Sequence, residues 1–260
     1  MSAACPEEPR AGETPDRTGP GAPVTVWDVD LTQAIDHRAT CRDLLSDDER
    51  ARASRFVRDV DRWRFEASHA ALRLVLGLRC GSDPRALVFG ATPSGKPHLV
   101  GEQAGSCRFS LSHSGSRALI GLSSSAEIGV DVEEMRPMPD LLRIAQAHFA
   151  PREIAALETL APRDLTVAFF ACWTRKEAVA KATGQGLSLR LDSFAVSVTP
   201  ERAELLAIPE GTAAWSLHAL PTAPDHLAAI AIMAADTGFL RRTLPPDWAA
   251  GLSTISQRGP

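Results

Sequence analysis

The chain has 260 residues, of which 44% are hydrophobic, and a formal net charge of −4. This size and apolar content suffice for one large domain or two small ones, and the nearly balanced charge gives no indication of a nucleic acid or an anionic membrane as partner. Its apolar runs fall short of the roughly 18 to 20 residues that span a bilayer, and the N-terminus lacks the apolar core of a signal peptide. The sequence therefore predicts a soluble cytoplasmic protein.

The first half of the chain mixes strand and helix patterns. Residues 1–23 are rich in Pro, Gly, Glu and Arg, which is typical of disorder. A long helix is expected to begin at Ser46, because Ser46 and Glu49 have the spacing of a capping box. The predicted elements are a strand at 24–29, a helix at 46–78, a strand at 87–89, a turn-rich loop at 91–99, and strands at 108–112 and 118–122 joined by the HSGS segment.

The second half repeats this mixture. Residues 128–133 read IGVDVE and alternate as a strand, with the apolar residues on one face and Gly129, Asp131 and Glu133 on the other. The further predicted elements are helices at about 140–149, 151–160 and 164–183, strands near 192–199, 213–220 and 226–234, and a loose tail at 244–260. The expected fold is α+β in two similar halves, 24–125 and 126–243, with a ligand site in the cleft between them.

Asp131 and Glu133 are the first candidates for chemistry. Two residues apart on a strand, their carboxylates project from one face and repel each other unless a cation or proton intervenes. Magnesium prefers such oxygen ligands and often shares its shell with phosphates. The alternative is a strand that simply turns its polar face to water.

Glu177 and Lys181 lie four residues apart on a predicted helix. They could be an ordinary surface pair, which stabilises a helix by only a few tenths of a kcal/mol. Trp173, four residues before Glu177, argues for a less exposed stripe, because an indole normally packs in a buried environment. Lys176 points about 100° away and is a candidate for a different part of the site.

Ser112 and His113 form a polar cluster at the end of a predicted strand. Because neighbours on a strand point to opposite faces, Ser112 is not placed to be a nucleophile activated by His113. A phosphate contact is a better interpretation of His113, with a structural role as the alternative. Lys96, in the GKP turn, is not part of a Walker A motif.

Taken in order, the segments GKPHL, FSLSHSGSRALIGLS, IGVDVEEMRP and WTRKEAVAKATGQGL resemble the 4'-phosphopantetheinyl transferases. The resemblance covers about residues 46–235 and is to the larger, monomeric type that activates peptide and polyketide synthetases. It implies transfer of the 4'-phosphopantetheine of coenzyme A to a serine of an apo acyl, peptidyl or aryl carrier protein, with release of 3',5'-ADP. It also implies Mg²⁺ dependence.

The resemblance assigns roles to matched residues. It implies Asp131, Glu133 and Glu177 as magnesium ligands, with Glu177, directly or through a water, as the base for the serine proton. Lys181 would neutralise the pyrophosphate and assist the leaving group. The residues implied in coenzyme A binding are Arg52, Arg64, Lys96, Ser112, His113, Lys176 and Lys181. Two positions depart from the family pattern: Glu49 replaces an expected basic residue, and Ser110 replaces an asparagine.

Two rival functions would use the same residues. A two-metal nuclease or phosphodiesterase usually needs a cluster of carboxylates and histidines, which this sequence does not offer in an HxH or HD pair. A non-catalytic homologue that binds coenzyme A or a carrier is the second, and retention of Asp131, Glu133, Glu177 and Lys181 argues against it.

Overall fold

The computed structural model describes residues 24–208 and 214–257, and in this part of the chain it is a mixed α+β structure, as predicted. The helices are α1 (Arg38–Leu44), α2 (Asp47–Ala53), α3 (Asp59–Cys80), α4 (Leu141–His148), α5 (Pro151–Glu158), α6 (Pro162–Thr183) and α7 (Trp248–Gln257). The strands are β1 (Val24–Asp30), β2 (Val88–Ala91), β3 (Pro97–Val100), β4 (Arg108–Ser114), β5 (Arg117–Ser123), β6 (Ile128–Glu134), β7 (Ala195–Val196), β8 (Leu205–Ala207), β9 (Ser216–Ala219), β10 (His226–Ile232) and β11 (Phe239–Thr243). Among these helices none is long and apolar enough to cross a membrane. The predicted disorder of residues 1–23 lies outside the described residues.

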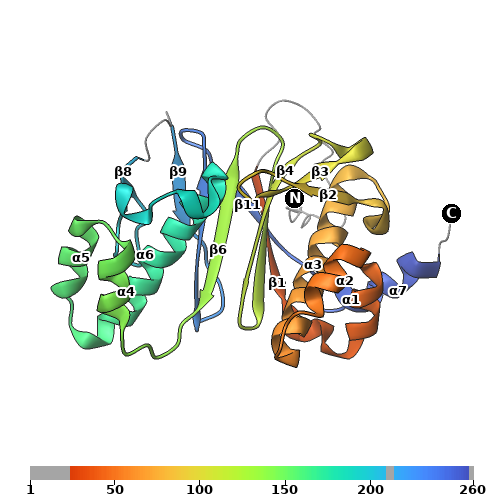
Figure 1. Cartoon of the computed structure of the whole chain (residues 1–260), viewed down its shortest axis with the longest axis horizontal. Coiled ribbons are helices and arrows are strands. Elements are labelled where there is room, and N and C mark those ends of the chain that lie inside the picture. The colour runs from red at the N-terminus through yellow and green to blue at the C-terminus, as the bar shows by residue number, and fades with distance from the viewer. Residues whose placement is uncertain (1–23, 209–213, 258–260) are drawn as a thin grey trace, which may run out of the picture.

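Two sheets lie side by side in the middle of the molecule, with helices at both ends of its long axis (Figure 1). The strand orders are β11-β1-β5-β4 and β6-β10-β9, and two small sheets pair β2 with β3 and β7 with β8. Apart from short 3-10 turns, two runs of the chain, residues 24–123 and residues 128–232, contain the same elements in the same order. Each has a strand, three helices, a two-stranded sheet and two further strands. In each run the last strand lies between the first and the penultimate one, so β1-β5-β4 and β6-β10-β9 have the same topology.

The two sheets pack against each other through apolar side chains. The predicted apolar face of β6 is confirmed here: Ile128, Val130 and Val132 are buried in a cluster with Val24 and Val26 of β1. Side chains on these strands alternate between two faces, so the second face of each strand can contact the helices or contribute to a site.

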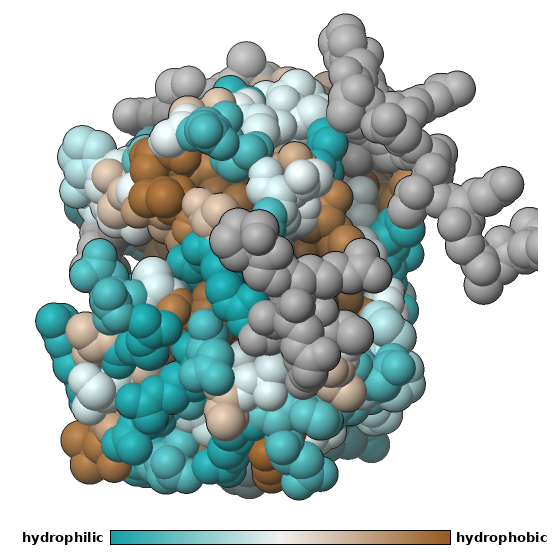
Figure 2. Space-filling view, turned by 90° about the vertical axis from the view of Figure 1, so that its right-hand side faces the viewer, coloured by the Kyte–Doolittle hydropathy of each residue, from teal (hydrophilic) through white to brown (hydrophobic). Residues whose placement is uncertain are grey.

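Helices cover the outer face of each sheet. α3 presents a run of small and apolar residues to the first-half core, and α6 does the same in the second half. Figure 2 looks at the first-half end of the molecule, where hydrophilic residues dominate the lower part of the view. The helices at this end therefore have the amphipathic character that a single-sided core requires.

The long helix predicted over 46–78 is interrupted. The capping box at its start is confirmed, with the Ser46 hydroxyl accepting from the Glu49 N–H and the Glu49 carboxylate accepting from the Ser46 N–H. However, α2 ends at Ala53 and α3 starts only at Asp59. Ser54 donates its hydroxyl proton to the Ala51 carbonyl, a side-chain bond that competes with helix continuation.

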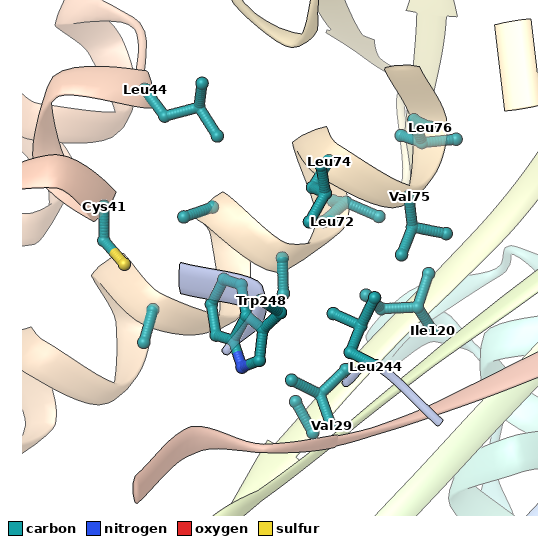
Figure 3. Packing of buried hydrophobic residues seen from close by; sticks show 14 of the residues in the cluster. Val29, Cys41, Leu44, Leu72, Leu74, Val75, Leu76, Ile120, Leu244 and Trp248 are labelled. Carbon is teal, nitrogen blue, oxygen red and sulfur yellow. The ribbon is translucent and has the colours of Figure 1, made fainter. Parts of the chain in front are cut away.

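The expectation of a loose tail at 244–260 is wrong for residues 244–252. β11 pairs in parallel with β1, and the chain then continues into α7. Leu244, Trp248 and Leu252 are buried in the first-half core. Figure 3 shows the Trp248 ring among side chains that include Cys41 and Val29. The sequence did not reveal this because the partners of the tail lie in the first half of the chain, far away in sequence.

Smaller differences concern short strands. The loop expected at 91–99 contains a turn followed by β3, and the strand near 192–199 shrinks to Ala195–Val196. β8 and β11 were not expected at all. All of these strands have at most five residues, too few for alternation to show in the sequence.

Candidate functional site

A cavity of about 960 Å³ is lined by residues from both sides of position 125. Of the predicted site residues, it is lined by Arg52, Lys96, His113, Glu177 and Lys181. Trp173 lines it as well, so the predicted stripe of Trp173, Glu177 and Lys181 on α6 does face one site. These side chains come from α2, the β2–β3 turn, β4 and α6.

One wall of the cavity is aromatic. The His69 ring stacks on Phe65 with 3.8 Å between ring centroids, and the Arg52 guanidinium lies 5.4 Å from the Phe65 centroid. Phe56, in the break between α2 and α3, completes this wall at 5.4 Å from Phe65. His69 was not among the predicted site residues, although its i,i+4 spacing from Phe65 places both on one helix face.

The wall beside it is positively charged. The pKa of His113 is lowered to about 4, first by burial and then by the charges of Lys181, Arg64 and Arg52. Burial, followed by His113, lowers the pKa of His69 to about 3. Both histidines are therefore neutral at pH 7. Three permanent cations around one imidazole form a site suited to phosphate groups.

Arg64 adds a second observation to this charge. Its Nη1 lies 3.9 Å from Asp61 Oδ1, a loose contact, and its Nε is buried without a hydrogen-bond partner among the described residues. Arg64 is not among the side chains that line the cavity, but it is close enough to depress the pKa of His113. A guanidinium with a buried, unused N–H donor fits an anion.

Next to these cations lies a compact polar triangle. Lys181 Nζ is 2.6 Å from Asp131 Oδ1 and 2.9 Å from Ser112 Oγ, and Ser112 donates to the same Asp131 oxygen at 2.9 Å. Asp131 is only 3% exposed, so the alternative of a strand face turned to water does not hold for it. Burial raises its pKa, and Lys181 opposes that rise. Its other oxygen, Oδ2, is buried with no partner in the described structure.

The charge of Asp131 acts on the other two predicted acidic residues, Glu133 and Glu177. Burial and then the Asp131 charge raise the pKa of both Glu133 and Glu177, and Glu133 adds to the effect on Glu177. Mutual repulsion of this kind is relieved by a cation. The described residues contain no three-residue His/Cys/Asp/Glu cluster that is already arranged to hold a metal ion. Their chemistry still fits Mg²⁺, since all three offer oxygen and one oxygen of Asp131 has no partner.

Lys96 reaches from the first half of the chain to the second. Its ammonium is 2.6 Å from Glu127 Oε2 and donates to the carbonyls of Ile128 and Ala182. The Ala182 carbonyl is in the last turn of α6, where a cation is favoured by the helix dipole. Lys96 thus lines the cavity while its ammonium is engaged in joining β6 and α6 to the β2–β3 turn.

Lys176 is not at the site, which corrects the expectation that it binds the coenzyme. Its side chain is fully buried, and its Nζ lies 2.8 Å from Glu153 Oε2. The same ammonium donates to the carbonyls of Leu191 and Phe194 and lies 4.3 Å from the Phe194 ring centroid. Because Lys176 points about 100° away from the stripe of Trp173, Glu177 and Lys181 on α6, its side chain lies in the second-half core.

The two departures from the family pattern have structural partners. Besides closing the capping box, the Glu49 carboxylate accepts from Nε of Arg73 at 2.8 Å, and Arg73 is 1% exposed. Ser110 accepts from the N–H of Val130 at 3.1 Å. Glu49 therefore stabilises the fold next to the site, and Ser110 joins β4 to β6.

Close contact between β6 and α6 sets the position of the acids. A Cβ on Gly129 would lie 2.0 Å from the Ala178 carbonyl oxygen and 2.5 Å from the Ala182 nitrogen. Only glycine allows this approach, which brings Glu177 and Lys181 of α6 beside Asp131 of β6. α6 then ends at Gly184, whose φ of 66° confirms the predicted C-terminal cap.

Comparisons with known proteins agree with this site. Residues 127–231 match the profile of the 4'-phosphopantetheinyl transferase superfamily. The protein slr0495 of Synechocystis sp. is 39% identical over 182 residues, which cover 70% of this chain and 74% of the relative. The 4'-phosphopantetheinyl transferase HetI of Nostoc sp. is 37% identical, covering 80% of this chain and 87% of the relative. The 4'-phosphopantetheinyl transferase Sfp of Bacillus subtilis is 30% identical, and the match covers 64% of this chain and 72% of the relative.

Proposed function

The chain belongs to the 4'-phosphopantetheinyl transferase family, and from this premise we propose that it moves the phosphopantetheine arm of coenzyme A to a serine of an apo carrier protein in a Mg²⁺-dependent reaction that releases 3',5'-ADP. The observation that carries the proposal is that a group of cations lies next to a group of acidic residues, with Arg52, Lys181 and Glu177 lining one cavity. Lys181, Arg52 and Arg64 gather around His113, and beside them the charge of Asp131 adds to the effect of burial in raising the pKa values of Glu133 and Glu177.

The cations are suited to the coenzyme. It carries a pyrophosphate and a 3'-phosphate, so its site needs several positive charges and donors. Arg52 and Arg64 would hold the 3'-phosphate, with neutral His113 donating a hydrogen bond. The face of the Phe65–His69 stack is suited to a nucleobase. The aliphatic part of the Lys96 side chain would lie along the nucleotide, since its ammonium is already bound to Glu127.

The acids are suited to the metal. Asp131, Glu133 and Glu177 would hold Mg²⁺, and the partnerless Oδ2 of Asp131 is an acceptor ready for it. A bound Mg²⁺ supplies positive charge where the pyrophosphate oxygens become more negative in the transition state.

Proton transfer falls to the protein. Glu177 accepts the proton of the carrier serine, directly or through a water, as the serine hydroxyl attacks the β-phosphorus of coenzyme A. Burial and the neighbouring acids raise the pKa of Glu177, which makes it a stronger base than an exposed carboxylate. The Lys181 ammonium stabilises the charge on the departing 3',5'-ADP.

The architecture expected for this activity is two α+β halves, 24–125 and 126–243, related by a pseudo-twofold axis with the site in the cleft between them. The equal order of elements and the matching topologies β1-β5-β4 and β6-β10-β9 support it. The lining of the cavity by residues from both halves supports the position of the site. A monomer acting in the cytoplasm is part of the same proposal.

Intact-protein mass spectrometry tests the function. An apo carrier protein incubated with this protein, coenzyme A and Mg²⁺ is expected to gain the mass of one phosphopantetheine, and EDTA is expected to prevent the gain. Glu177→Ala is expected to slow the transfer by about 10² to 10⁴-fold, because it removes the base. Glu158→Ala, at the last residue of α5, is the matched control and is expected to behave as the wild type.

One outcome would overturn the proposal. If acyl, peptidyl and aryl carriers all remain unmodified while calorimetry shows that coenzyme A binds, the chain is a binding homologue without transferase activity.

A further inference from the structure

The joint between β4 and β6 is made by serine side chains. The two strands belong to different sheets, so no backbone ladder connects them. Ser110, Ser112 and Ser114 alternate along β4 and point their hydroxyls at β6. Each hydroxyl accepts a hydrogen bond from one backbone N–H of that strand.

The bonds follow a two-residue repeat. Ser110 accepts from Val130 N–H at 3.1 Å and Ser112 from Val132 N–H at 3.4 Å. Ser114 accepts from Glu134 N–H at 3.1 Å. The three serines therefore have the same structural role, because each provides a hydrogen-bond acceptor for a β6 amide that faces β4.

Two of the three serines also donate to an acid. Ser112 Oγ donates to Asp131 Oδ1 at 2.9 Å, and Ser114 Oγ donates to Glu133 Oε2 at 2.9 Å. In both cases the acidic residue directly precedes the residue whose N–H donates to the serine: Asp131 precedes Val132, and Glu133 precedes Glu134. Ser110 accepts from Val130, and the residue directly before Val130 is Gly129, which has no side chain to receive a proton.

These bonds fix how the carboxylates present their oxygens. A hydroxyl has one proton to donate, and a bond from it to a carboxylate is charge-assisted. Asp131 Oδ1 receives Ser112 and Lys181, so the unpartnered Oδ2 is the oxygen left for another ligand. Ser112 is itself 7% exposed, which leaves its hydroxyl little access to a cofactor phosphate.

We propose that Ser112 and Ser114 are positioning residues that orient the Asp131 and Glu133 carboxylates for a divalent cation, rather than contacts to a coenzyme phosphate. The inference rests on the proposed function, because it takes these acids as the metal ligands. Partners of this kind typically change metal affinity by about 10 to 100-fold when they are removed.

The chain supplies its own matched control. Ser114→Ala removes a backbone acceptor and a carboxylate donor, and Ser112→Ala removes these together with an acceptor of Lys181 Nζ. Ser110→Ala removes a backbone acceptor alone. Ser114→Thr keeps the hydroxyl and is the conservative variant. Ser114 is only half-buried, so its variants are expected to fold even if a change at the buried Ser112 prevents folding.

Binding of Mn²⁺ to the full chain, followed by the EPR signal of the free ion with coenzyme A present, is the measurement. Ser112→Ala and Ser114→Ala are expected to weaken Mn²⁺ binding about 10 to 100-fold. Ser110→Ala and Ser114→Thr are expected to stay within about threefold of the wild type. The KM for coenzyme A is expected to be unchanged in all four variants, with the Mg²⁺ requirement raised in the first two.

Three results would overturn the inference. Equal Mn²⁺ affinity in the Ser110, Ser112 and Ser114 alanine variants would mean that all three serines only join the strands. A higher KM for coenzyme A with unchanged Mn²⁺ affinity in Ser112→Ala would assign Ser112 to the phosphate. A wild-type chain that binds coenzyme A but no Mn²⁺ would refute both this inference and the proposed metal site, whereas wild-type binding with unaffected variants refutes the inference alone.

Discussion

At the scale of single residues, the cavity is lined by two half-buried histidines that stay neutral among cations. His69 stacks on Phe65, and His113 faces Lys181, Arg64 and Arg52. The folded chain resists protonation of both rings, because burial and the neighbouring charges lower their pKa values to about 3 and about 4 from an ordinary 6.5. The unfolded chain has no such resistance.

This difference makes stability depend on pH. Below pH 6.5 the unfolded chain takes up protons at both histidines and the folded chain does not, so the free energy of unfolding falls as the pH falls from 6.5 toward 4. Each histidine contributes about 1.4 kcal/mol per pH unit in this window. Urea unfolding at pH 7, 6 and 5 measures the slope. His69→Gln is expected to flatten it, and His98→Gln, at an exposed position, is the control; equal slopes in both variants would contradict the assignment.

Lys176 gives a second prediction at this scale, because its ammonium binds a buried carboxylate and not the coenzyme. Lys176→Met leaves the buried Glu153 carboxylate without its cation, which is expected to cost about 3 to 5 kcal/mol in the free energy of unfolding. Arg163→Ala, in an exposed pair, is the control and is expected to cost under about 1 kcal/mol. Coenzyme A affinity, measured by calorimetry on the folded variant, is expected to change less than twofold. A large loss of affinity would restore Lys176 to the site.

At the scale of elements, the contact between β6 and α6 sets the geometry of the acids. In Gly129→Ala the new methyl would overlap the Ala178 carbonyl, so either the helix or the strand must shift. The expected cost is about 3 kcal/mol or more in the free energy of unfolding, together with reduced transfer. Gly238→Ala is the control, because nothing lies within 4 Å of its Cβ. Thermal and urea unfolding of both variants test this, and an unaffected Gly129→Ala would show that the approach of α6 does not depend on glycine.

The elements also show where sequence reasoning ends. α6 and β6 are long and regular, and their periodicity gave Glu177, Lys181 and Asp131 their correct faces. The same periodicity ran through the break between α2 and α3, because Phe56 has helical spacing although it lies outside both helices.

At the scale of the whole molecule, the C-terminal segment ties the end of the chain to its beginning. Trp248 is 3% exposed in the first-half core, and Arg241 of β11 pairs with buried Asp28 of β1 at 2.6 Å. Trp248→Ala is expected to lower the free energy of unfolding by about 3 to 5 kcal/mol, whereas Leu240→Ala, at a 45% exposed side chain of β11, is expected to cost under about 1 kcal/mol. Urea unfolding distinguishes this packed segment from a loose tail, in which neither substitution would matter.

The sequence by itself determined the residue types and spacings of the chemistry: an acid pair on one strand face, a Glu–Lys stripe on a helix, and the family that unites them. Local periodicity is enough for this, since each pattern lies within one element. Only the tertiary structure decided that Lys176 faces a core, that Lys96 and Ser112 are held by protein groups, and that His69 and Trp248 belong to the cavity and the first-half core. These outcomes depend on contacts between distant segments, and no local pattern encodes which buried partner a side chain will meet.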